Sequence, residues 1–398
     1  MCGKGEVGGV LFEPAYQIAG SITHEVGAAL LICSIVGMAY ACVATLACLA
    51  FSRRRPFNAT AFPSIALFKP LHGDEPGLYE NLKSYCVQDY PGAVQIVFGV
   101  QDPADAAIGV VEALRLDYPH VDIRLVIDQA RHGTNRKISN LINMADRASA
   151  DIVVISDSDV RVGSDHLRKI VGALEQPGVG LVTCLYRGRP TGSRWSSLAA
   201  MDIDYRFSLG VVMGVTLGIA HPCLGPTMAL RRTTLEAVGG FRYLSNFLAD
   251  DYELGRAVRG LGHKMIFAPD LIDHLCPEQS LREMLTHEFR WARTVRMIEP
   301  VGYFGSVITH FWVLALIGAP FLGGVGWALF GLATLVRLML IALLGPNMAT
   351  PPNLLWAPLR DLLSFAVFVA AFFSDRVVWR GAQLKLERTG EITTFLSR

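Results

Sequence analysis

The chain has 398 residues, of which 52% are hydrophobic and only 18% charged, and its formal net charge is +1. So small a charged share indicates a membrane protein, and the near-zero net charge argues against a nucleic-acid-binding chain. The eight cysteines are scattered and form no close pair of the kind that binds zinc or exchanges electrons. We therefore expect reduced, buried thiols in a protein whose soluble part faces the cytosol.

The first candidate membrane segment covers 26–51, which contains no charged residue and is long enough to cross a bilayer as a helix. Arg53, Arg54 and Arg55 follow it at once, whereas acidic residues dominate 1–25. The positive-inside rule therefore places 1–25 outside the cytoplasm and the arginines inside it. The segment lacks the basic start and short apolar core of a cleaved signal peptide, so we interpret 26–51 as a signal anchor.

From residue 60 to 298 the pattern changes to short β-rich runs that alternate with amphipathic stretches. Such alternation is typical of an α/β domain with a mostly parallel sheet and helices on both faces. A helix is expected over Leu78–Cys86, and another opens after His132 and runs to about Ala148. Expected strands cover Ser64–Lys69, Val94–Val100, Val121–Ile127, the run before Asp157, Val179–Leu185 and Met228–Leu230. Several of these strands end in polar or acidic residues, which predicts a ligand site at one edge of the sheet.

The strongest site signal is Asp157-Ser158-Asp159, which ends the buried run that starts at Asp151. Two carboxylates one residue apart offer hard oxygen ligands for Mg²⁺ or Mn²⁺ bound to a diphosphate. Alternatively, the pair is only turn chemistry, with an Asp capping a helix that begins near Ser164. We expect a nucleotide-diphosphate metal site.

Two other strand ends offer nucleotide contacts. Asp102 before Pro103 suits a contact with a base or ribose, or else only an Asx turn. Lys137 follows Arg136 at the start of a helix, where an anionic phosphate is favoured; a solvated charge is the alternative. The glycine at position 133 in the same loop favours the phosphate contact.

The second acidic pair, Asp250-Asp251, opens a helix that follows the stretch beginning at His221. N-capping explains one Asp but not two beside Tyr252 and Glu253, so a carboxylate here is a candidate general base for an acceptor hydroxyl. The apolar but charge-bearing stretch Trp195–Gly218 suits either a membrane-interface element or core packing.

A strongly patterned helix is predicted over 280–298. Arg290 and Arg293 are three residues apart and share a face, so with Trp291 they could clamp a diphosphate. Juxtamembrane arginines also meet lipid head groups. We expect Arg290 and Trp291 at the site and Arg296 at the lipid.

The C-terminal region 300–375 is again apolar and accommodates two or three membrane segments. Arg376 and Arg380 favour a cytoplasmic tail, 376–398, which requires an even number of full crossings after the soluble domain.

Taken together, these motifs resemble those of the membrane-bound, inverting glycosyltransferases of families 2 and 21. Within them the chain is similar to the ceramide glucosyltransferases, and more closely to a bacterial branch with the hopanoid-biosynthesis-associated glycosyltransferases. The resemblance covers nearly the whole chain. It is carried by Lys69-Pro-Leu, Gly99-Val-Gln-Asp102-Pro, Asn135-Arg-Lys137 with Asn140, Asp157-Ser-Asp159, Asp250-Asp251-Tyr and Arg290-Trp291.

The resemblance implies a GT-A type fold, with Asp102 on the uridine of a UDP-sugar and Asp157 and Asp159 on the metal. It also implies Asp251 as the catalytic base. Arg290 and Trp291 match the end of the family's Gln/Arg-x-x-Arg-Trp motif, but His287 replaces its first residue, which counts against a processive polysaccharide synthase.

The expected protein is therefore a multi-pass enzyme of a bacterial inner membrane with its catalytic domain in the cytoplasm. It would move one hexose, glucose or N-acetylglucosamine, from a UDP-sugar to a lipid hydroxyl, ceramide or hopanoid polyol, with Mg²⁺ or Mn²⁺. A processive synthase and a non-catalytic nucleotide-sugar-binding protein are the alternatives. Expected donor contacts are Lys69, Asp102, Lys137, Asp157, Arg290, Trp291 and Arg293, and expected pocket residues are His221, Asp250 and His287.

Overall fold

The computed structural model describes residues 13–348, 353–379, 382–387 and 389–396. Its first helix, α1, covers Glu13–Ser52. Within α1, His24–Ser52 is apolar and long enough to cross a membrane, and it contains the predicted anchor 26–51. The helix starts earlier than the anchor, inside the segment that we expected to precede the membrane.

The domain that follows α1 is built on one eight-stranded sheet. Its strands are β1 Ile65–Pro70, β2 Val94–Val100, β3 Asp122–Ile127, β4 Ile152–Ser156, β5 Val160–Arg161, β6 Val179–Pro190, β7 Thr227–Arg231 and β8 Lys264–Cys276. They lie in the order β3-β2-β1-β4-β7-β6-β8-β5. Strands β3, β2, β1 and β4 are parallel to one another, as are β6 and β8, whereas β7 pairs antiparallel with β4 and β6, and β5 pairs antiparallel with β8. The predicted mostly parallel sheet is confirmed.

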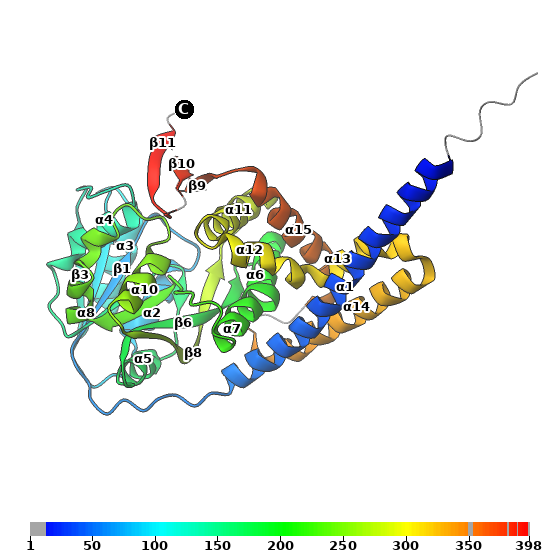
Figure 1. Ribbon diagram of the computed structural model, residues 1–398. Helices are drawn as coiled ribbons and strands as arrows, with labels where there is room; N and C mark the ends of the chain where they lie inside the picture. The colour runs from blue at the N-terminus through cyan, green and yellow to red at the C-terminus, as the bar shows by residue number, and fades with distance from the viewer. Residues whose placement is uncertain (1–12, 349–352, 380–381, 388, 397–398) are drawn as a thin grey trace, which may run out of the picture.

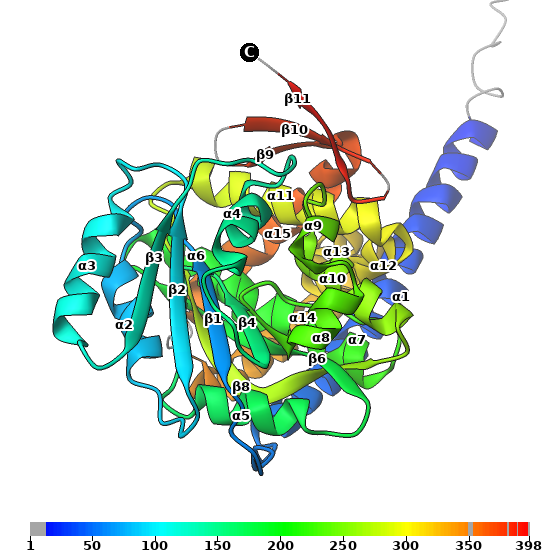
Figure 2. The ribbon, with the colours of Figure 1, turned by 90° about the vertical axis from the view of Figure 1, so that its left-hand side faces the viewer.

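Helices cover both faces of this sheet (Figure 2). One face is covered by α2 Leu78–Cys86, α3 Ala107–Asp117 and α5 His166–Leu174, and the other by α4 Arg136–Ala145, α8 Arg232–Ala237, α9 Gly240–Tyr243 and α10 Asp250–Gly260. Two separate clusters of buried apolar side chains lie under these two groups of helices. Every side chain of β1 and β4 is buried, as expected of central parallel strands covered on both sides.

The C-terminal part of the sheet departs from expectation. Strand β6 extends five residues past the predicted Leu185, and β8 was not predicted at all. The two strands pair in parallel from Val179 to Pro190, so each stabilises the length of the other through non-local hydrogen bonds. Local sequence does not encode such pairing.

The stretch Trp195–Gly218 forms α6 Arg194–Asp202, a short π-helix η1 Ile203–Phe207, and α7 Ser208–Thr216. Most of its side chains are buried, and α7 packs against α1. Of the two interpretations, core packing therefore describes most of this stretch. It lies between the sheet and the apolar helices.

After α11, Leu281–Ile298, the chain becomes apolar. Its elements are α12 Pro300–Gly305, η2 Ser306–His310, α13 Phe311–Gly318, η3 Ala319–Leu322, α14 Gly323–Leu344, η4 Gly345–Asn347, η5 Leu354–Trp356, α15 Ala357–Ala370 and η6 Ala371–Phe373. Pro300–Asn347 and Leu354–Phe373 are, like α1, long and apolar enough to cross a membrane. The chain reverses at Gly323, whose φ of 54° is rarely adopted by other residues. Consequently α13 and α14 both lie along α1 (Figure 1).

The predicted tail 376–398 contains structure that we did not expect. Strands β9 Arg376–Trp379, β10 Ala382–Leu386 and β11 Ile392–Leu396 form an antiparallel sheet in the order β11-β10-β9. This sheet packs against α11 and bridges to Phe247. The end of the chain therefore packs on the sheet domain, and the even number of crossings stays a prediction.

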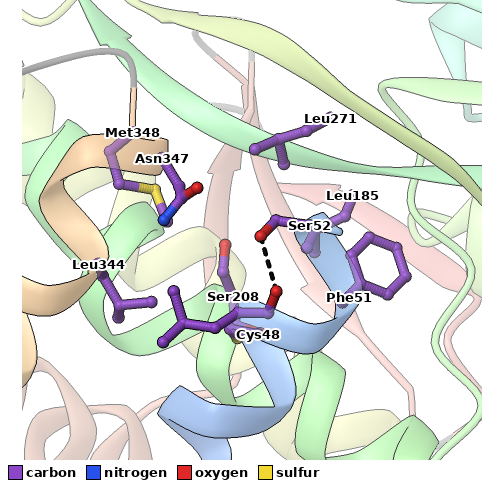
Figure 3. Close-up of a pocket in the computed structure, with 10 residues that line it drawn as sticks. Cys48, Phe51, Ser52, Leu185, Ser208, Leu271, Leu344, Asn347 and Met348 are labelled. Carbon is purple, nitrogen blue, oxygen red and sulfur yellow. Dashed lines mark hydrogen bonds between the residues drawn. The ribbon is translucent and has the colours of Figure 1, made fainter. Parts of the chain in front are cut away.

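A small apolar pocket marks the junction of the helices with the sheet (Figure 3). It lies where α1 and α14 end, against the first residue of α7 and strands β6 and β8. Its lining residues are Cys48, Leu49, Phe51, Ser52, Leu185, Ser208, Leu271, Leu344, Asn347 and Met348. None of the predicted site residues is among them.

Candidate active site

The Asp157-Ser158-Asp159 turn follows β4 at the carboxyl end of the parallel strands. Two backbone bonds hold it: Asp157 N–H donates to the carbonyl of Pro226 at 3.3 Å, and Leu275 N–H donates to the carbonyl of Asp159 at 2.8 Å. The next helix begins at His166 and has Asp165 as its N-cap residue. Neither aspartate of the turn caps that helix, so the helix-capping alternative is excluded.

Lys69 lies beneath this turn and not on its open side. Its side chain is fully buried, and Nζ donates to the carbonyl of Asp157 at 2.8 Å and to Ser156 Oγ at 3.3 Å. The ammonium also sits 3.8 Å from the centre of the Tyr85 ring. Burial lowers the pKa of Lys69 to about 7 despite the neighbouring carboxylates. The expected donor contact is thus corrected: Lys69 supports the acidic turn from below.

Lys137 joins the two acidic pairs. Its Nζ lies 2.8 Å from Asp157 Oδ1 and 3.5 Å from Asp250 Oδ2, and only 12% of its side chain is exposed. Asn135, the N-cap of α4, donates from Nδ2 to the carbonyl of Phe247 at 2.7 Å and to Asp250 Oδ1 at 3.4 Å. The loop before α4 and Lys137 therefore hold the start of α10 next to Asp157, a contact that sequence reasoning did not anticipate.

Asp251 occupies the first turn of α10 and faces the loop before β7. One carboxylate oxygen, Oδ2, accepts from Gly225 N–H at 2.8 Å, and the other accepts from the backbone N–H of Tyr252 at 2.8 Å. Burial, with the adjacent Asp250 carboxylate, raises the pKa of Asp251 to about 6. A carboxylate with such a pKa is a better proton acceptor near neutral pH than an ordinary aspartate.

His274, near the end of β8, is a site residue that sequence reasoning missed. Its Nδ1 lies 3.5 Å from Asp159 Oδ1, and within the described part of the chain neither atom has a hydrogen-bond partner. The imidazole is buried and packs against Tyr186 and Trp291. The available signal was a run of polar residues at the end of an apolar stretch, but only the pairing of β8 with β5 and β6 brings His274 to Asp159.

The helix α11 contributes a second group beside His274. The His287 ring lies 4.4 Å from Trp291, and its Nδ1 is 2.9 Å from Glu278 Oε1. Among the described residues, the other oxygen of the buried Glu278 has no hydrogen-bond partner. Arg290 lies between His287 and Trp291 along the helix. The structure thus brings His287 and Trp291 next to His274, and through it next to Asp159.

Arg293 and Arg296 make their contacts with the C-terminal part of the chain and not with the acidic turn. Arg293 stacks over Phe289 and donates to the carbonyl of Arg376 at 2.7 Å, while Arg296 donates to the carbonyl of Ser374 at 3.2 Å. Both arginines hold the C-terminal sheet on α11. The expectation of a paired Arg290–Arg293 clamp is replaced by this packing role of Arg293, whereas Arg296 at the lipid stays a prediction.

Asp102 and His221 lie on exposed loops. Asp102 Oδ1 accepts from Ala104 N–H at 2.9 Å, the Asx turn considered from the sequence. Asn140 holds the preceding strand end by donating to the carbonyl of Gly99 at 2.7 Å. The carbonyl of His221 accepts from Arg259, and its ring is exposed. Neither side chain makes a contact with the acidic pairs in the described residues.

Another group of metal-ligating side chains lies away from this site, buried among α5, β6 and β8. It consists of His166, Cys184 and Asp270. One oxygen of Asp270 accepts from Lys169 at 2.8 Å and the other is 2.6 Å from His166 Nδ1. Because Lys169 already neutralises Asp270, the group is better explained as an internal ion pair that ties α5 to the sheet.

Known proteins were compared with the chain. Ceramide glucosyltransferase 1 of Caenorhabditis elegans is 22% identical over 348 residues, covering 83% of this chain and 73% of the relative. An N-acetylglucosaminyltransferase of Rhizobium meliloti is 23% identical over 248 residues, covering 60% and 57%. The solved structure of mannosyltransferase PcManGT from Pyrobaculum calidifontis, in complex with GDP-Man and Mn²⁺, has a TM-score of 0.54 at 21% identity and covers 88% of this chain and 98% of that one. That likeness shows the GT-A type glycosyltransferase fold.

The family assignment rests on a broader match. The family model described as glycosyl transferase family 21 matches residues 29–392, which include the later part of α1, the whole sheet domain and the C-terminal helices. Because the match extends over far more than half of the chain, this protein belongs to glycosyl transferase family 21.

Proposed function

We propose that this glycosyltransferase transfers one hexose from a UDP-sugar to the hydroxyl of a membrane lipid, with inversion at the anomeric carbon. The observation that carries the proposal is the position of Asp251. Its pKa is raised to about 6. Lys137 contacts both Asp157 and Asp250, so Asp251, the residue after Asp250, lies close to the carboxylates proposed to bind the metal. A proton acceptor next to a diphosphate site is the arrangement that direct displacement requires.

The relatives support a lipid acceptor and a hexose donor. Two relatives from Caenorhabditis elegans that cover over four fifths of this chain are named ceramide glucosyltransferases, and the Rhizobium meliloti relative is named an N-acetylglucosaminyltransferase. We therefore propose glucose or N-acetylglucosamine as the sugar, and ceramide or a hopanoid polyol as the acceptor. The apolar helices pack directly on the sheet domain, so a lipid hydroxyl at the bilayer surface can reach the site without leaving the membrane.

A divalent metal fits the site. Asp159 Oδ1 and His274 Nδ1 face each other at 3.5 Å, and in the described residues neither has a hydrogen-bond partner. A cation bound by Asp157, Asp159 and His274 would satisfy both atoms, and the imidazole favours Mn²⁺ over Mg²⁺. When bound, such an ion supplies Lewis-acid stabilisation of the charge on the departing diphosphate.

The side chains of the protein divide the remaining work. Asp251 accepts the proton of the acceptor hydroxyl, while Gly225 N–H fixes the direction of one of its oxygens. Lys137 supplies a positive charge between the diphosphate acids and the base. Arg290 is proposed to stabilise the leaving diphosphate, with Trp291 packing beside it. Asp102 is proposed to contact uridine when the exposed loop closes on the donor.

The orientation is also part of the proposal. Arg53, Arg54 and Arg55 follow α1 directly and are exposed, and by the positive-inside rule they support a sheet domain on the cytoplasmic side of what we propose is a bacterial inner membrane. Cytoplasmic UDP-sugar would then reach the acidic turn from the aqueous side.

Membranes that contain the full chain, incubated separately with UDP-glucose and UDP-N-acetylglucosamine, test the proposal. Ceramide and a hopanoid polyol serve as acceptors, and the lipids are analysed by mass spectrometry. One sugar added to one lipid is the expected product. A ladder of products would indicate a processive synthase, and nucleotide-sugar binding without transfer would indicate the non-catalytic alternative.

A further inference from the structure

A buried arginine connects the apolar helix α15 to the sheet domain. Arg360 lies within the apolar stretch Leu354–Phe373, yet only 1% of it is exposed. Its guanidinium forms a two-pronged ion pair with Glu288 of α11, from Nη1 to Oε1 at 2.6 Å and from Nη2 to Oε2 at 2.8 Å. An arginine inside an apolar segment is costly and is usually retained for a specific purpose.

Arg360 also contacts Ser364 of its own helix and one further helix of the junction, α6. Its Nε donates to Ser364 Oγ at 3.0 Å and lies 3.6 Å from Asp202 Oδ1 of α6. Ser364 Oγ donates to the same aspartate at 2.6 Å, and Arg206 forks onto both of its oxygens. Every oxygen of Asp202 and Glu288 therefore has a partner. Arg206 and Arg360 each make two directed hydrogen bonds to one carboxylate, and these paired bonds fix the geometry of the network.

Because Glu288 lies on α11, its ion pair with Arg360 affects how that helix is oriented. Met284 and Glu288 are four residues apart and form the face of α11 that meets Arg360. Trp291 and His287 lie on the adjoining face, and Arg290 lies beyond His287, about 160° around the helix from Glu288, since successive residues are about 100° apart. Fixing Glu288 therefore fixes the direction in which the site face points. Rotation of α11 would leave the buried Glu288 carboxylate without its partner and would remove the two-pronged pair from Arg360, which is strongly unfavourable.

The other end of the connection is anchored among the apolar helices. Asp361, the next residue of α15, pairs with Arg337 of α14 through two bonds of 2.7 and 2.8 Å. Arg337 also donates to the carbonyl of Tyr205 at 2.9 Å. Adjacent residues of α15 thus hold α14 on one side and α11 on the other.

We propose that Arg360 is a positioning residue: through Glu288 it sets the rotation of α11 about its axis, and so aims His287, Arg290 and Trp291 at the donor diphosphate. The inference rests on the proposed function, because it assigns the α11 face to the donor. It makes the membrane helices part of the active-site frame, in addition to anchoring the enzyme. Misplacement by about 1 Å can reduce a rate on the order of 100-fold, so the aim of α11 has a measurable effect.

The decisive variant replaces the ion pair with apolar residues, Arg360→Met with Glu288→Leu. Such replacements are often neutral for stability because no buried charge is left unpaired. The matched control, Arg337→Met with Asp361→Leu, removes the other two-pronged pair of α15 but leaves the Arg360–Glu288 contact intact. For both, turnover per folded enzyme, donor KM and the unfolding temperature are measured on the full chain in membranes or detergent.

We expect the Arg360/Glu288 variant to lose roughly tenfold or more in kcat at an unfolding temperature near that of the wild type, and the control to stay within about twofold. Wild-type turnover in the first variant, or an equal loss in both, would overturn the proposal. If the double variant does not fold, Arg360→Lys keeps the charge without the fork. A reduced kcat for this variant supports the proposal, and an unchanged kcat contradicts it.

A second measurement separates this inference from the proposed function. Amide hydrogen exchange of residues 281–298 reports the packing of α11 without any substrate. We expect faster exchange in the Arg360/Glu288 variant than in the control, even if the wild type transfers neither tested sugar. Absence of transfer by the wild type would contradict the proposed function only, whereas unchanged exchange in α11 would contradict the positioning role.

Discussion

The acidic edge of the sheet and the junction of α6, α11 and α15 use the same kinds of charged side chains in opposite ways. At the junction, both oxygens of Asp202 and both oxygens of Glu288 meet arginine or serine donors. At the acidic edge, Asp159 Oδ1 and Asp250 Oδ2 are buried and have only ion-pair contacts of 3.5 Å, with His274 and Lys137, and no hydrogen-bond partner for them is found in the described residues. Buried polar atoms without partners are costly, so they are tolerated where a ligand completes them.

This difference distinguishes a structural network of charged residues from a candidate ligand-binding site. The satisfied network holds helices in one arrangement and has no capacity left for a ligand. The unsatisfied edge contains a lysine, four aspartates and a histidine, with acceptor atoms still to be used. Charged residues alone would not distinguish the two regions, whereas their unsatisfied atoms do.

The largest predicted effect is on the base. Asp251→Asn removes the proton acceptor but keeps the size of the side chain and one acceptor oxygen for Gly225 N–H. We expect kcat to fall by about 10²- to 10⁴-fold while UDP-sugar binding is kept. The measurement is glycolipid formation alongside donor binding by calorimetry. Asp165→Asn, which changes a half-exposed carboxylate on α5, is the control. Normal turnover by Asp251→Asn would refute the assignment of the base.

The second-largest predicted effect is the metal dependence of transfer, which depends on Asp159 and His274. A chelator is expected to abolish transfer, and Mn²⁺ or Mg²⁺ to restore it. His274→Ala should raise the metal concentration needed for half-maximal activity by roughly 10- to 100-fold, by analogy with the loss of other groups that hold a metal site. Direct Mn²⁺ binding, measured without donor, checks the same shift. Full activity in chelator would show that the acidic turn is a turn only.

The smallest effect is the pH dependence. Because the pKa of Asp251 is raised to about 6, its ionised form predominates above that pH and is lost as the pH falls through it. A base must be ionised to act, so kcat/KM should decrease roughly tenfold per pH unit below about 6 and level off above it. The profile is measured between pH 5 and 8 with the unfolding temperature as control. A flat profile over this range would argue against Asp251 as the base.

The sequence determined the parts of the fold that depend on local pattern. The charge-free run 26–51, the helix Leu78–Cys86 and the strand Val94–Val100 follow from apolar length and periodicity, and the structure has each of them. The acidic turn could also be placed in advance, since β4 is a buried run that ends abruptly in two carboxylates. Sequence spacing likewise placed Asp250 and Asp251 at the start of a helix.

Only the tertiary structure decided which charged residue does what. Lys69 and Arg293 belong to promising motifs, yet one is buried under the turn and the other faces the C-terminal sheet. His274 and Glu278 were invisible because they reach the site through β8, whose length depends on pairing with β6. Arg360 was only an interruption in an apolar stretch until its partners appeared 72 and 158 residues away in Glu288 and Asp202. A sequence pattern reports the chemistry that a residue can do, whereas its role depends on the partners that folding brings to it, and long-range pairing supplies those partners.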